Sequence, residues 1–374
     1  MKISVDRDVL TEAVTWTARA LAPRPATPVL SGILITAADN TLTFEAFDYT
    51  TSAHLDVDAN IETEGSVLVS GKMLADIART LPAAPVTLEL ENAKLTVSCG
   101  RSRFHLATMP VDEYPSLPKM PDVLGTVDGT EFSRAVAQVS VAAARDETLP
   151  ILTGIKVEFE DDTMTLLATD RYRLAMRELN WKPAGSSVST SALVKAKTLS
   201  DVAKTLGSAG ELSICMEENG DIVGFVSGSR RTTTLLVDGD YPKIRSLFPE
   251  ESLIHASVST PELIEAVRRV SIVAERNTPV RLQFTDAQVA LDAGTGEEAQ
   301  AEEAIESQLN GDEITVAFNP PFLSEGLSAF DTENVQFAFT TAPKPAMLTA
   351  LDQETGQPDM SFRYLVMPVR LPNA

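Results

Sequence analysis

"VDRDVLTEAV" (Val5–Val14) occurs twice more in the chain in altered form, as "VDGTEFSRAV" (Val127–Val136) and "VSTPELIEAV" (Val258–Val267). The three stretches align without a gap, with a large apolar residue at the sixth position and alanine at the ninth. The first two copies continue in register, because "LSGILITAADNTLTFEAFD" (Leu30–Asp48) aligns with "LTGIKVEFEDDTMTLLATD" (Leu152–Asp170). The pattern indicates three tandem copies of one unit of roughly 125 residues, the size of an ordinary domain.

Each copy contains a helix, hairpin strands, a second helix and further hairpin strands. The strand-like runs alternate apolar and polar residues with period two, as in "VTLELENAKLTVSC" (Val86–Cys99), which is typical of antiparallel sheets with one buried face. The second helices are expected in "GKMLADIARTL", "KAKTLSDVAKTL" and "NPPFLSEGLSAF". We therefore predict an α+β fold of three helix-and-antiparallel-sheet domains.

Two proline-rich linkers mark the predicted domain boundaries. Val111–Gly125 and Val237–Ser252 each contain an acidic residue followed by Tyr-Pro, so they are equivalent points of the repeat. We place the domains at residues 1–120, 121–252 and 253–374.

The helix of the third copy is predicted to begin at a threonine cap. In "VSTPELIEAVRRVSIVAER" (Val258–Arg276), Thr260 is the candidate N-cap and Pro261 the first helical residue. Arg269 and Arg276 fall roughly opposite the apolar face of this helix. An arginine-bearing face is often only a solvated surface, so its meaning depends on the other helices.

Acidic residues are concentrated outside the predicted helices. The chain has 374 residues and a formal net charge of −22. The helical segments 6–21, 71–80, 130–145, 195–206, 260–276 and 320–330 hold 12 Lys and Arg against 10 Asp and Glu, a net charge of +2, which leaves −24 elsewhere. This asymmetry favours helices that face a polyanion such as duplex DNA while the sheets face water. A few cations give weak, salt-dependent attraction to phosphates without base readout.

Composition and cysteine use favour a cytoplasmic protein. No apolar run reaches the ~18 residues of a membrane span, and the N-terminus has no signal-peptide pattern. Cys99 and Cys215 lie in strand-like runs and are expected to be buried, reduced thiols. The three histidines, His54, His105 and His255, show no metal-ligand spacing.

No motif supports catalysis or cofactor binding. "SGKM" (Ser70–Met73) lacks the first glycine and the metal-binding hydroxyl of a phosphate loop. "GTGEE" (Gly294–Glu298) runs into acid, which would repel a phosphate. A nuclease or phosphoesterase is the enzymatic alternative, but it needs clustered metal ligands, and the helices contain no histidine. A carbohydrate- or protein-binding repeat module is another alternative, although it would have no reason to spare its helices from acid. We predict a protein that is not an enzyme and holds no metal or cofactor.

Two segments of opposite charge are candidates for contact between copies of the chain. "SCGRSRFHLATM" (Ser98–Met109) is predicted as a strand with Arg101 and Arg103 on one face and Phe104 and Leu106 on the other. "GEEAQAEEAIE" (Gly296–Glu306) is either a solvated loop or an acidic partner for that strand, through Glu297, Glu298, Glu302 and Glu303. Two copies joined head to tail twice would close a ring. Ile272 and Val273 complete the candidate interface residues.

Four motifs make the whole chain resemble the bacterial sliding clamp, the beta subunit of the replicative DNA polymerase. They are "GRSRFHLATMP" (Gly100–Pro110), "LATDRYRLA" (Leu167–Ala175), "LLVDGDYPKI" (Leu235–Ile244) and "YLVMPVRL" (Tyr364–Leu371). The resemblance implies a ring-shaped homodimer of six domains that encircles duplex DNA, with helices lining the hole. Such a ring tethers the polymerase and confers processivity.

The resemblance also implies which residues meet DNA. Lys72, Lys197 and Arg269 match positions on the channel-facing helices, and Arg24 lies in "APRPATP", a loop that meets DNA in the family. Charge and helix phase alone add Arg79 and Lys204.

In the family, a pocket between the second and third domains binds a short apolar motif of polymerases, the clamp loader and repair proteins. The matching positions are Leu152, Thr169, Arg171, Tyr172, Arg173, Leu174, Pro242, Leu247, Val366, Met367, Pro368, Val369 and Arg370. The apolar tail is either a pocket wall or a plain final strand on its own core. Arg171 and Tyr172 depart from the family pattern, in which a small residue and histidine are common, and Ser246 stands where some members have arginine.

Overall fold

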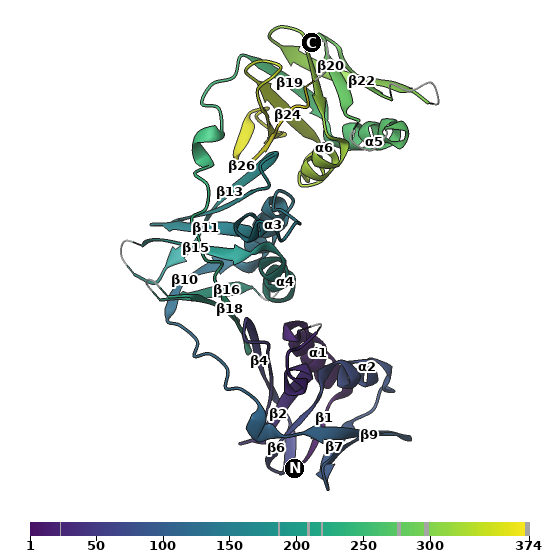
Figure 1. Cartoon of the computed structure of the whole chain (residues 1–374), viewed down its shortest axis with the longest axis vertical. Helices are drawn as coiled ribbons and strands as arrows, with labels where there is room; N and C mark the ends of the chain where they lie inside the picture. The colour runs from purple at the N-terminus through teal and green to yellow at the C-terminus, as the bar shows by residue number, and fades with distance from the viewer. Residues whose placement is uncertain are drawn as a thin grey trace. The chain divides into compact units, whose positions relative to one another are not determined.

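Two antiparallel sheets organise the chain, and each lies within one of two compact units. The computed structural model describes residues 1–22, 24–185, 188–207, 210–217, 220–274, 278–294 and 299–370. The first unit comprises Met1–Glu131, Trp181–Ser186 and Asp201–Leu236, and the second comprises Phe132–Asn180, Ser187–Ser200 and Val237–Ala374. Figure 1 colours these segments along the chain.

The sheet of the first unit has 14 strands in the described residues, all joined by antiparallel pairs. In spatial order they are β14 (Lys182–Pro183), β10 (Val123–Asp128), β16 (Glu211–Met216), β17 (Ile222–Ser227), β18 (Arg230–Leu235), β4 (Thr51–Asp58), β3 (Thr41–Phe47), β2 (Gly32–Ala38), β6 (Gly65–Ser70), β9 (Ser102–Met109), β8 (Lys94–Cys99), β7 (Val86–Glu91), β1 (Lys2–Val5) and β5 (Asn60–Thr63).

The sheet of the second unit has 12 strands in the part of the chain that the structure describes. Their order is β15 (Ser189–Lys195), β11 (Gly154–Glu160), β12 (Thr163–Thr169), β13 (Arg173–Asn180), β26 (Pro358–Val366), β25 (Ala346–Leu351), β24 (Asn334–Phe339), β19 (Ile254–Ser259), β22 (Ala301–Asn310), β21 (Gln288–Ala293), β20 (Val280–Phe284) and β23 (Ile314–Phe318). The predicted α+β class with antiparallel sheets is confirmed.

Two strand pairs explain why three sequence repeats form two units. The central repeat sends β18 to pair with β4, where Thr232 lies opposite Ala53. It sends β13 to pair with β26, where Leu174 lies opposite Leu365. The sheets therefore run without a break across the predicted domain boundaries, and the strands of the central repeat are divided between them.

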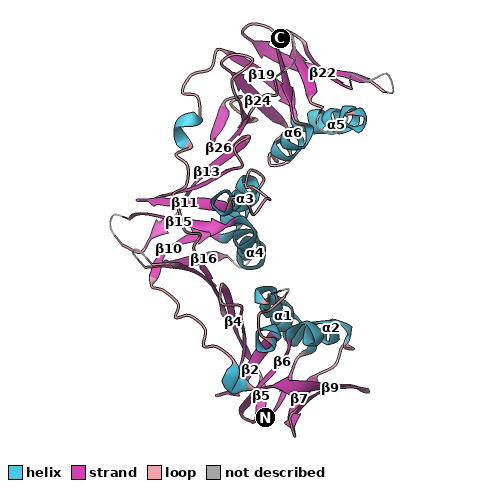
Figure 2. Cartoon of the chain, in the orientation of Figure 1, coloured by secondary structure: helices cyan, strands magenta, loops and turns pink. Residues whose placement is uncertain are grey.

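Six α-helices lie at the positions predicted from the repeat. They are α1 (Arg7–Thr17), α2 (Gly71–Thr80), α3 (Gly129–Ser140), α4 (Ala196–Leu206), α5 (Thr260–Val270) and α6 (Pro320–Leu327), counted over the described residues. α1 packs against α2 in the first unit, and α5 against α6 in the second. Figure 2 shows the helices of each pair beside their sheet.

Several helix ends differ from the prediction. The helices expected over 6–21, 130–145, 260–276 and 320–330 end at Thr17, Ser140, Val270 and Leu327. After α5 the run Ser271–Val273 forms a 3-10 turn, because β-branched residues are poor helix formers and Ser271 donates its hydroxyl hydrogen bond back to Val267.

The predicted N-cap of α5 was wrong by one residue. Ser259 has the extended backbone of a cap, and Thr260 is the first helical residue, with a buried side chain. Pro261 still lies in the first turn, where its missing N–H costs no helical hydrogen bond. Arg276 lies outside the described residues.

The two cysteines are free and buried, as predicted. Burial in the first unit raises the pKa of the Cys215 thiol. In the described part of the chain, no helix has the length and hydropathy needed to cross a membrane.

Candidate partner-binding and nucleic-acid interfaces

A tight turn between β12 and β13 carries the first group of predicted pocket residues. Asp170 follows β12 directly, and its Oδ1 accepts hydrogen bonds from the N–H groups of Tyr172 at 3.0 Å and Arg173 at 3.1 Å. Aspartate favours this turn because its short side chain binds the backbone two and three residues ahead. Arg171 has a φ of 80°, a left-handed conformation that usually selects glycine. The turn therefore places the Arg171 and Tyr172 side chains outward, where both are exposed.

Buried contacts of the Arg173 side chain stabilise this turn. The Arg173 side chain is buried, with Nε 3.0 Å from Oδ2 of Asp170 and Nη1 2.7 Å from Oε2 of Glu325 on α6. The guanidinium also lies 4.5 Å from the ring centroid of Phe322, which stacks on Tyr172 with centroids 5.9 Å apart. A buried arginine needs such partners, because an unpaired buried charge is costly.

The C-terminal segment forms one wall beside the turn. β26 pairs with β13 up to Val366, opposite Arg173. Beyond the strand, Met367 donates its N–H to the carbonyl oxygen of Tyr172 at 2.9 Å, and Val369 donates to Ala317 at 2.7 Å. Val366 is buried at the end of this strand, while Met367 and Val369 lie past its end and are exposed.

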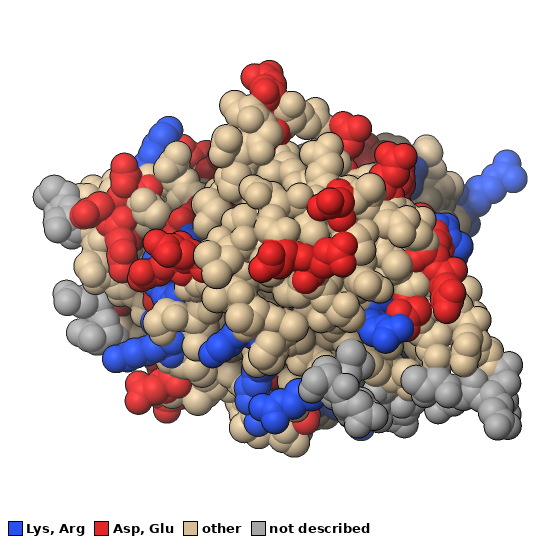
Figure 3. All heavy atoms as spheres, turned by 90° about the horizontal axis from the view of Figure 1, so that it is seen from above, with Lys and Arg blue, Asp and Glu red and all other residues tan. Residues whose placement is uncertain are grey.

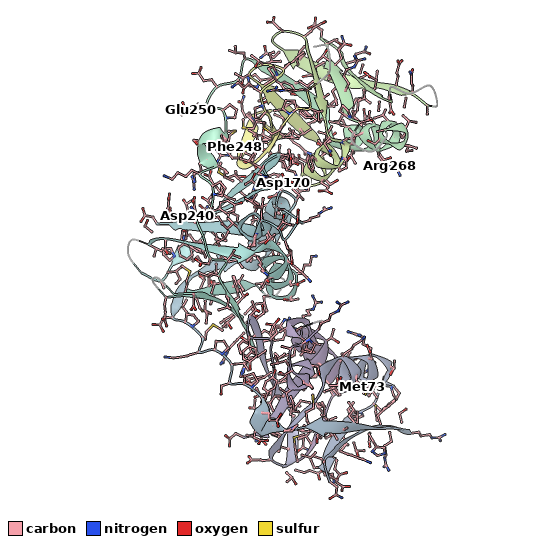
Figure 4. The ribbon with its side chains drawn as sticks, in the orientation of Figure 1. Met73, Asp170, Asp240, Phe248, Glu250 and Arg268 are labelled. Atoms are coloured by element: carbon pink, nitrogen blue, oxygen red, sulfur yellow. The ribbon has the colours of Figure 1, made fainter. Side chains whose placement is uncertain are left out.

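The floor of this region is an apolar cluster of the second unit. Its buried members are Leu167, Leu174, Met176, Ile244, Phe248, Ala338, Met347 and Leu365, and Tyr241 packs against them. The Tyr241 hydroxyl oxygen accepts the Thr169 N–H at 3.0 Å, and burial raises the pKa of this phenol. Figure 4 labels Asp170 and Phe248 in this region.

The predicted pocket residues thus belong to one unit but differ in access. Tyr172 and Leu247 are 55% and 56% exposed, so two large side chains of this region lie open to solvent. The other exposed members are Arg171, Pro242, Met367, Val369 and Arg370, Pro368 is half-buried, and the buried ones are Leu152, Thr169, Arg173, Leu174 and Val366.

The turn of the first repeat has the same backbone geometry. Asp48 Oδ1 accepts the N–H groups of Thr50 at 2.8 Å and Thr51 at 2.6 Å, and Tyr49 has a φ of 69°. Leu235 donates its N–H to the Thr50 carbonyl at 2.9 Å, as Met367 does to Tyr172. The side chains differ: the first repeat has Phe47 and Tyr49 where the second has Thr169 and Arg171, and the two aromatic rings meet edge to face at 5.5 Å.

The predicted DNA-contacting cations fall into two groups. Arg24, Lys72, Lys197 and Lys204 are exposed and form no ion pair within the described residues. Arg79 and Arg269 are exposed too, but each is paired: Arg79 with Asp76 at 3.0 Å, and Arg269 with Glu303. Ion pairing leaves less positive potential for a phosphate. The free lysines of α2 and α4 are therefore the stronger candidates.

An open groove follows α2 in the first unit. It encloses about 480 Å³ and is lined by Ser70, Lys72, Met73, Asp76, Ile77 and Thr80. Ser70 caps the helix by accepting the Met73 N–H at 3.4 Å, while Leu74, Ala75 and Ala78 face the core. The outer face consequently presents exposed Met73, labelled in Figure 4, beside a lysine.

The two segments predicted to join copies are both strands with a free edge. β9 pairs with β8 along its length, but only Thr108 and Met109 also pair with β6. β22 pairs with β21 over 301–306 and with β19 over 307–310. The first part of each strand therefore lacks a second neighbour among the described residues.

Two details of the interface prediction require correction. Arg101 lies in the turn between β8 and β9 and not on the strand, because Gly100 with a φ of 57° reverses the chain there. The part of the acidic run from Ala301 onward is strand, so the reading of a solvated loop fails there. Of the remaining candidates, Arg103, Ile272 and Glu302 are exposed, Phe104, Val273 and Glu303 are half-buried, Leu106 is buried, and Glu297 and Glu298 lie outside the described residues.

Sequence reasoning missed a groove between α3 and α6 in the second unit. It encloses about 430 Å³ and is lined by Arg134, Ala137, Gln138, Val141, Arg145, Ser324, Glu325, Ser328, Ala329 and Asp331. Arg134 pairs with Asp331 at 2.6 Å and Arg145 with Glu325 at 2.8 Å. Both arginines are among the cations of the predicted helices. The sequence could not indicate their carboxylate partners, because these lie almost 200 positions away.

One face of the molecule carries side chains of both charges. Figure 3 shows one face with many acidic side chains scattered among uncharged ones. Within the described residues, no group of three or more His, Cys, Asp or Glu side chains is arranged to hold a metal ion.

Comparison with known proteins places the chain in a family. Models of the N-terminal, central and C-terminal domains of the DNA polymerase III beta subunit match residues 1–118, 126–243 and 245–370. The chain is 50% identical to the beta sliding clamp of Streptomyces coelicolor over 99% of its length and 100% of the relative. It is 60% identical to that of Micrococcus luteus over 82% of its length and 98% of the relative.

Solved structures agree with this assignment. A sliding clamp from Pseudomonas aeruginosa is 26% identical and superposes with a TM-score of 0.92, covering 99% of this chain and 100% of that one. The clamp of Bacillus subtilis is 27% identical with a TM-score of 0.91, covering 99% of each chain. Three matching domains and this fold define a clamp protein of DNA replication, which is not an enzyme. The chain belongs to the DNA polymerase III beta subunit family, the beta sliding clamps, which are processivity factors.

Proposed function

We propose that the chain acts as a ring-shaped homodimer that encircles duplex DNA and slides along it. The observation that carries this proposal, beside family membership, is the pair of free strand edges of opposite charge. β9 presents exposed Arg103, and β22 presents exposed Glu302 and Glu306. An edge with unpaired N–H and C=O groups readily adds another strand, and opposite charges steer that pairing.

Two copies joined by both edge pairs make a closed, two-fold assembly of six domains, with boundaries near residues 120 and 252 in each chain. Exposed Ile272, 80% accessible on the turn after α5, and exposed Met73 in the α2 groove add a hydrophobic component to this contact. Closure retains DNA by topology, so the protein can be acidic overall and still stay on its substrate.

In this proposal DNA meets the helices. Arg24, Lys72, Lys197 and Lys204 supply unpaired cations for the phosphates, with smaller contributions from Arg79 and Arg269 because these two are already paired. The contacts read no bases, which permits sliding.

The exposed apolar side chains around the Asp170 turn are the proposed docking site for partners. They would receive the short apolar motif of the replicative polymerase, the clamp loader and repair proteins. Tyr172, Leu247, Met367 and Val369 provide the contact surface, and the buried cluster beneath keeps them in place. Because the proposed function is carried out on chromosomal DNA, we expect the protein to be cytoplasmic.

A retention experiment tests the ring. Protein loaded by its clamp loader onto nicked circular DNA should stay bound through gel filtration and be lost when a restriction enzyme linearises the circle. Equal loss from circular and linear DNA would exclude topological retention. Sedimentation adds a second measurement: the dimer should have twice the chain mass of 40.2 kDa.

A further inference from the structure

The groove between α3 and α6 is connected to the Asp170 turn by an unbroken chain of charged contacts. At the groove, Arg145 Nη2 lies 2.8 Å from Oε1 of Glu325. The second oxygen of the same carboxylate, Oε2, lies 2.7 Å from Nη1 of buried Arg173. One glutamate therefore holds an exposed arginine with one oxygen and a buried arginine with the other.

The buried arginine in turn fixes the docking turn. Its Nε contacts Asp170 Oδ2 at 3.0 Å, and Oδ1 of the same aspartate holds the backbone of Tyr172 and Arg173. Phe322, one turn before Glu325 on α6, packs between the Arg173 guanidinium and the Tyr172 ring. The Phe322 carbonyl also accepts a hydrogen bond from the Tyr364 hydroxyl at 2.7 Å. Helix α6 therefore contacts the residues of the Asp170 turn in two ways, through the Glu325 carboxylate and through the Phe322 ring.

The two ends of this chain of contacts differ in mobility. The Arg145 side chain is 78% exposed, so it can leave Glu325 for another anion at little cost. Arg173 is only 4% exposed and cannot, because it would lose both carboxylates in a buried site. An anion that enters the groove will thus take Arg145 and leave Glu325 to Arg173 alone.

We propose that the α3–α6 groove binds the phosphodiester backbone of DNA through Arg134 and Arg145, more weakly than the unpaired lysines do because each arginine must exchange its carboxylate partner for a phosphate. We propose further that occupation of the groove tightens peptide binding at the Asp170 turn through Glu325 and Arg173. This inference rests on the proposed function, since it needs DNA at the helices and a peptide at the turn. Arg173 acts as a positioning residue that holds the rim.

The direction of the effect follows from charge. While Arg145 is bound, the Glu325 carboxylate is shared between two guanidinium groups. When a phosphate draws Arg145 away, the whole negative charge faces Arg173, and charge-assisted hydrogen bonds are the strong ones. A more firmly held Asp170 turn presents Tyr172 in one orientation, and a preorganised rim loses less entropy when the peptide binds.

The test measures one affinity under two conditions. The probe is a fluorescein-labelled peptide of leucine and phenylalanine, side chains that suit the apolar rim, and its Kd is measured by anisotropy with and without a saturating short DNA duplex. We expect the duplex to tighten binding about five-fold, at the lower end of usual couplings between sites. By linkage the peptide must tighten duplex binding by the same factor.

Variants separate this coupling from folding. Arg145→Ala should bind the peptide about five-fold more tightly than the wild type without DNA, because Glu325 then faces Arg173 alone, and should show no further tightening with DNA. Arg268→Ala is the matched control, because Arg268 is an exposed arginine of the same unit whose Nη2 pairs with Glu265 at 2.9 Å. That control should keep the five-fold effect. Leu247→Asp should abolish peptide binding in both conditions, which assigns the signal to the proposed docking site.

The outcomes are distinguishable. If peptide and duplex both bind but the peptide affinity is the same in both conditions, or if Arg145→Ala keeps the tightening, the coupling is refuted and the proposed function stands. If the peptide does not bind, or Leu247→Asp binds it normally, the docking site itself is refuted.

Discussion

Arg269 on α5 and Glu303 on β22 form a two-point ion pair, with Nε 2.9 Å from Oε2 and Nη2 2.5 Å from Oε1. The hydrogen bond raises the pKa of the Arg269 guanidinium and lowers the pKa of the Glu303 carboxyl. The sequence suggested Arg269 for DNA and Glu303 for the partner chain, and the fold instead joins them to each other. One ion pair thus links a residue of the predicted DNA-binding surface to a residue of the predicted dimer interface.

Removal of the carboxylate should release Arg269 for DNA. Glu303→Gln is expected to steepen the dependence of log Kd on log salt concentration by about one unit, the contribution of one extra phosphate contact. The measurement is a salt titration of duplex binding by fluorescence anisotropy. Glu262→Gln is the control, because Glu262 is an exposed carboxylate of α5 outside the proposed dimer contact. An equal change in both variants would show a general charge effect and no released arginine.

Loss of a free lysine should weaken DNA binding more than loss of a paired arginine. Lys72→Ala and Arg79→Ala change exposed residues of one helix, but only Arg79 is held by a carboxylate. We expect Lys72→Ala to lower the salt slope by about one unit and Arg79→Ala to lower it less. Lys94→Ala, on strand β8, controls for net charge and should have a smaller effect than either. A larger loss in Arg79→Ala than in Lys72→Ala would contradict the ranking.

Reversal of charge should reveal the proposed strand pairing between copies. Arg103→Glu is expected to give monomers in sedimentation velocity, and Glu302→Arg in the same chain should restore dimers. Arg103 is preferable to Leu106 as a test site, because Leu106 is buried and its truncation costs about 2–5 kcal/mol of folding stability. Arg103→Glu that remains dimeric at low salt, where the introduced repulsion is least screened, would remove β9 from the interface.

His54 should make the first unit less stable as the pH rises. The hydrogen bond with Glu45 raises the pKa of His54, against the opposing effect of burial, and Asp56 adds a second hydrogen bond from the other side. A raised folded pKa stabilises the protein below the unfolded value of about 6.5, and this stability is lost as the pH climbs through the folded pKa. Urea unfolding at several pH values should show the decline, and His54→Gln should remove it. A profile that is the same in both proteins would rule out this role.

The repeat was sufficient to predict most of the fold. Alignment of Leu10, Phe132 and Leu263 placed three helices and, with period-two strands, indicated antiparallel sheets. The repeat could not show that the central copy is divided between two sheets. The pairs β18–β4 and β13–β26 join strands of different repeats, which are far apart in the sequence. Helix ends failed for a local reason: the apolar period continues through residues such as Ser271–Val273 that no longer form an α-helix.

The candidate sites were predictable to different degrees. The family resemblance indicated the residues around Asp170 and most of the predicted DNA-contacting cations. Charge and helix phase added only Arg79 and Lys204. Neither could show that Glu325 binds two arginines or that Glu303 occupies Arg269, since both pairs join residues far apart in the sequence. The sequence also could not show which of these residues are exposed. Tyr172 and Leu174 lie two positions apart in one motif, yet Tyr172 is exposed and Leu174 is buried.

The turn at Asp48 has the same backbone geometry as the turn at Asp170 but carries different side chains, with Phe47 and Tyr49 in place of Thr169 and Arg171. An ancestor built by triplication would have carried this scaffold more than once, so the proposed docking site required only a few side-chain exchanges and no new loop. Selection could then change the side chains of one copy while the backbone of every copy stayed the same. Such a history accounts for a protein whose repeats share one backbone architecture and differ in the side chains that their turns present.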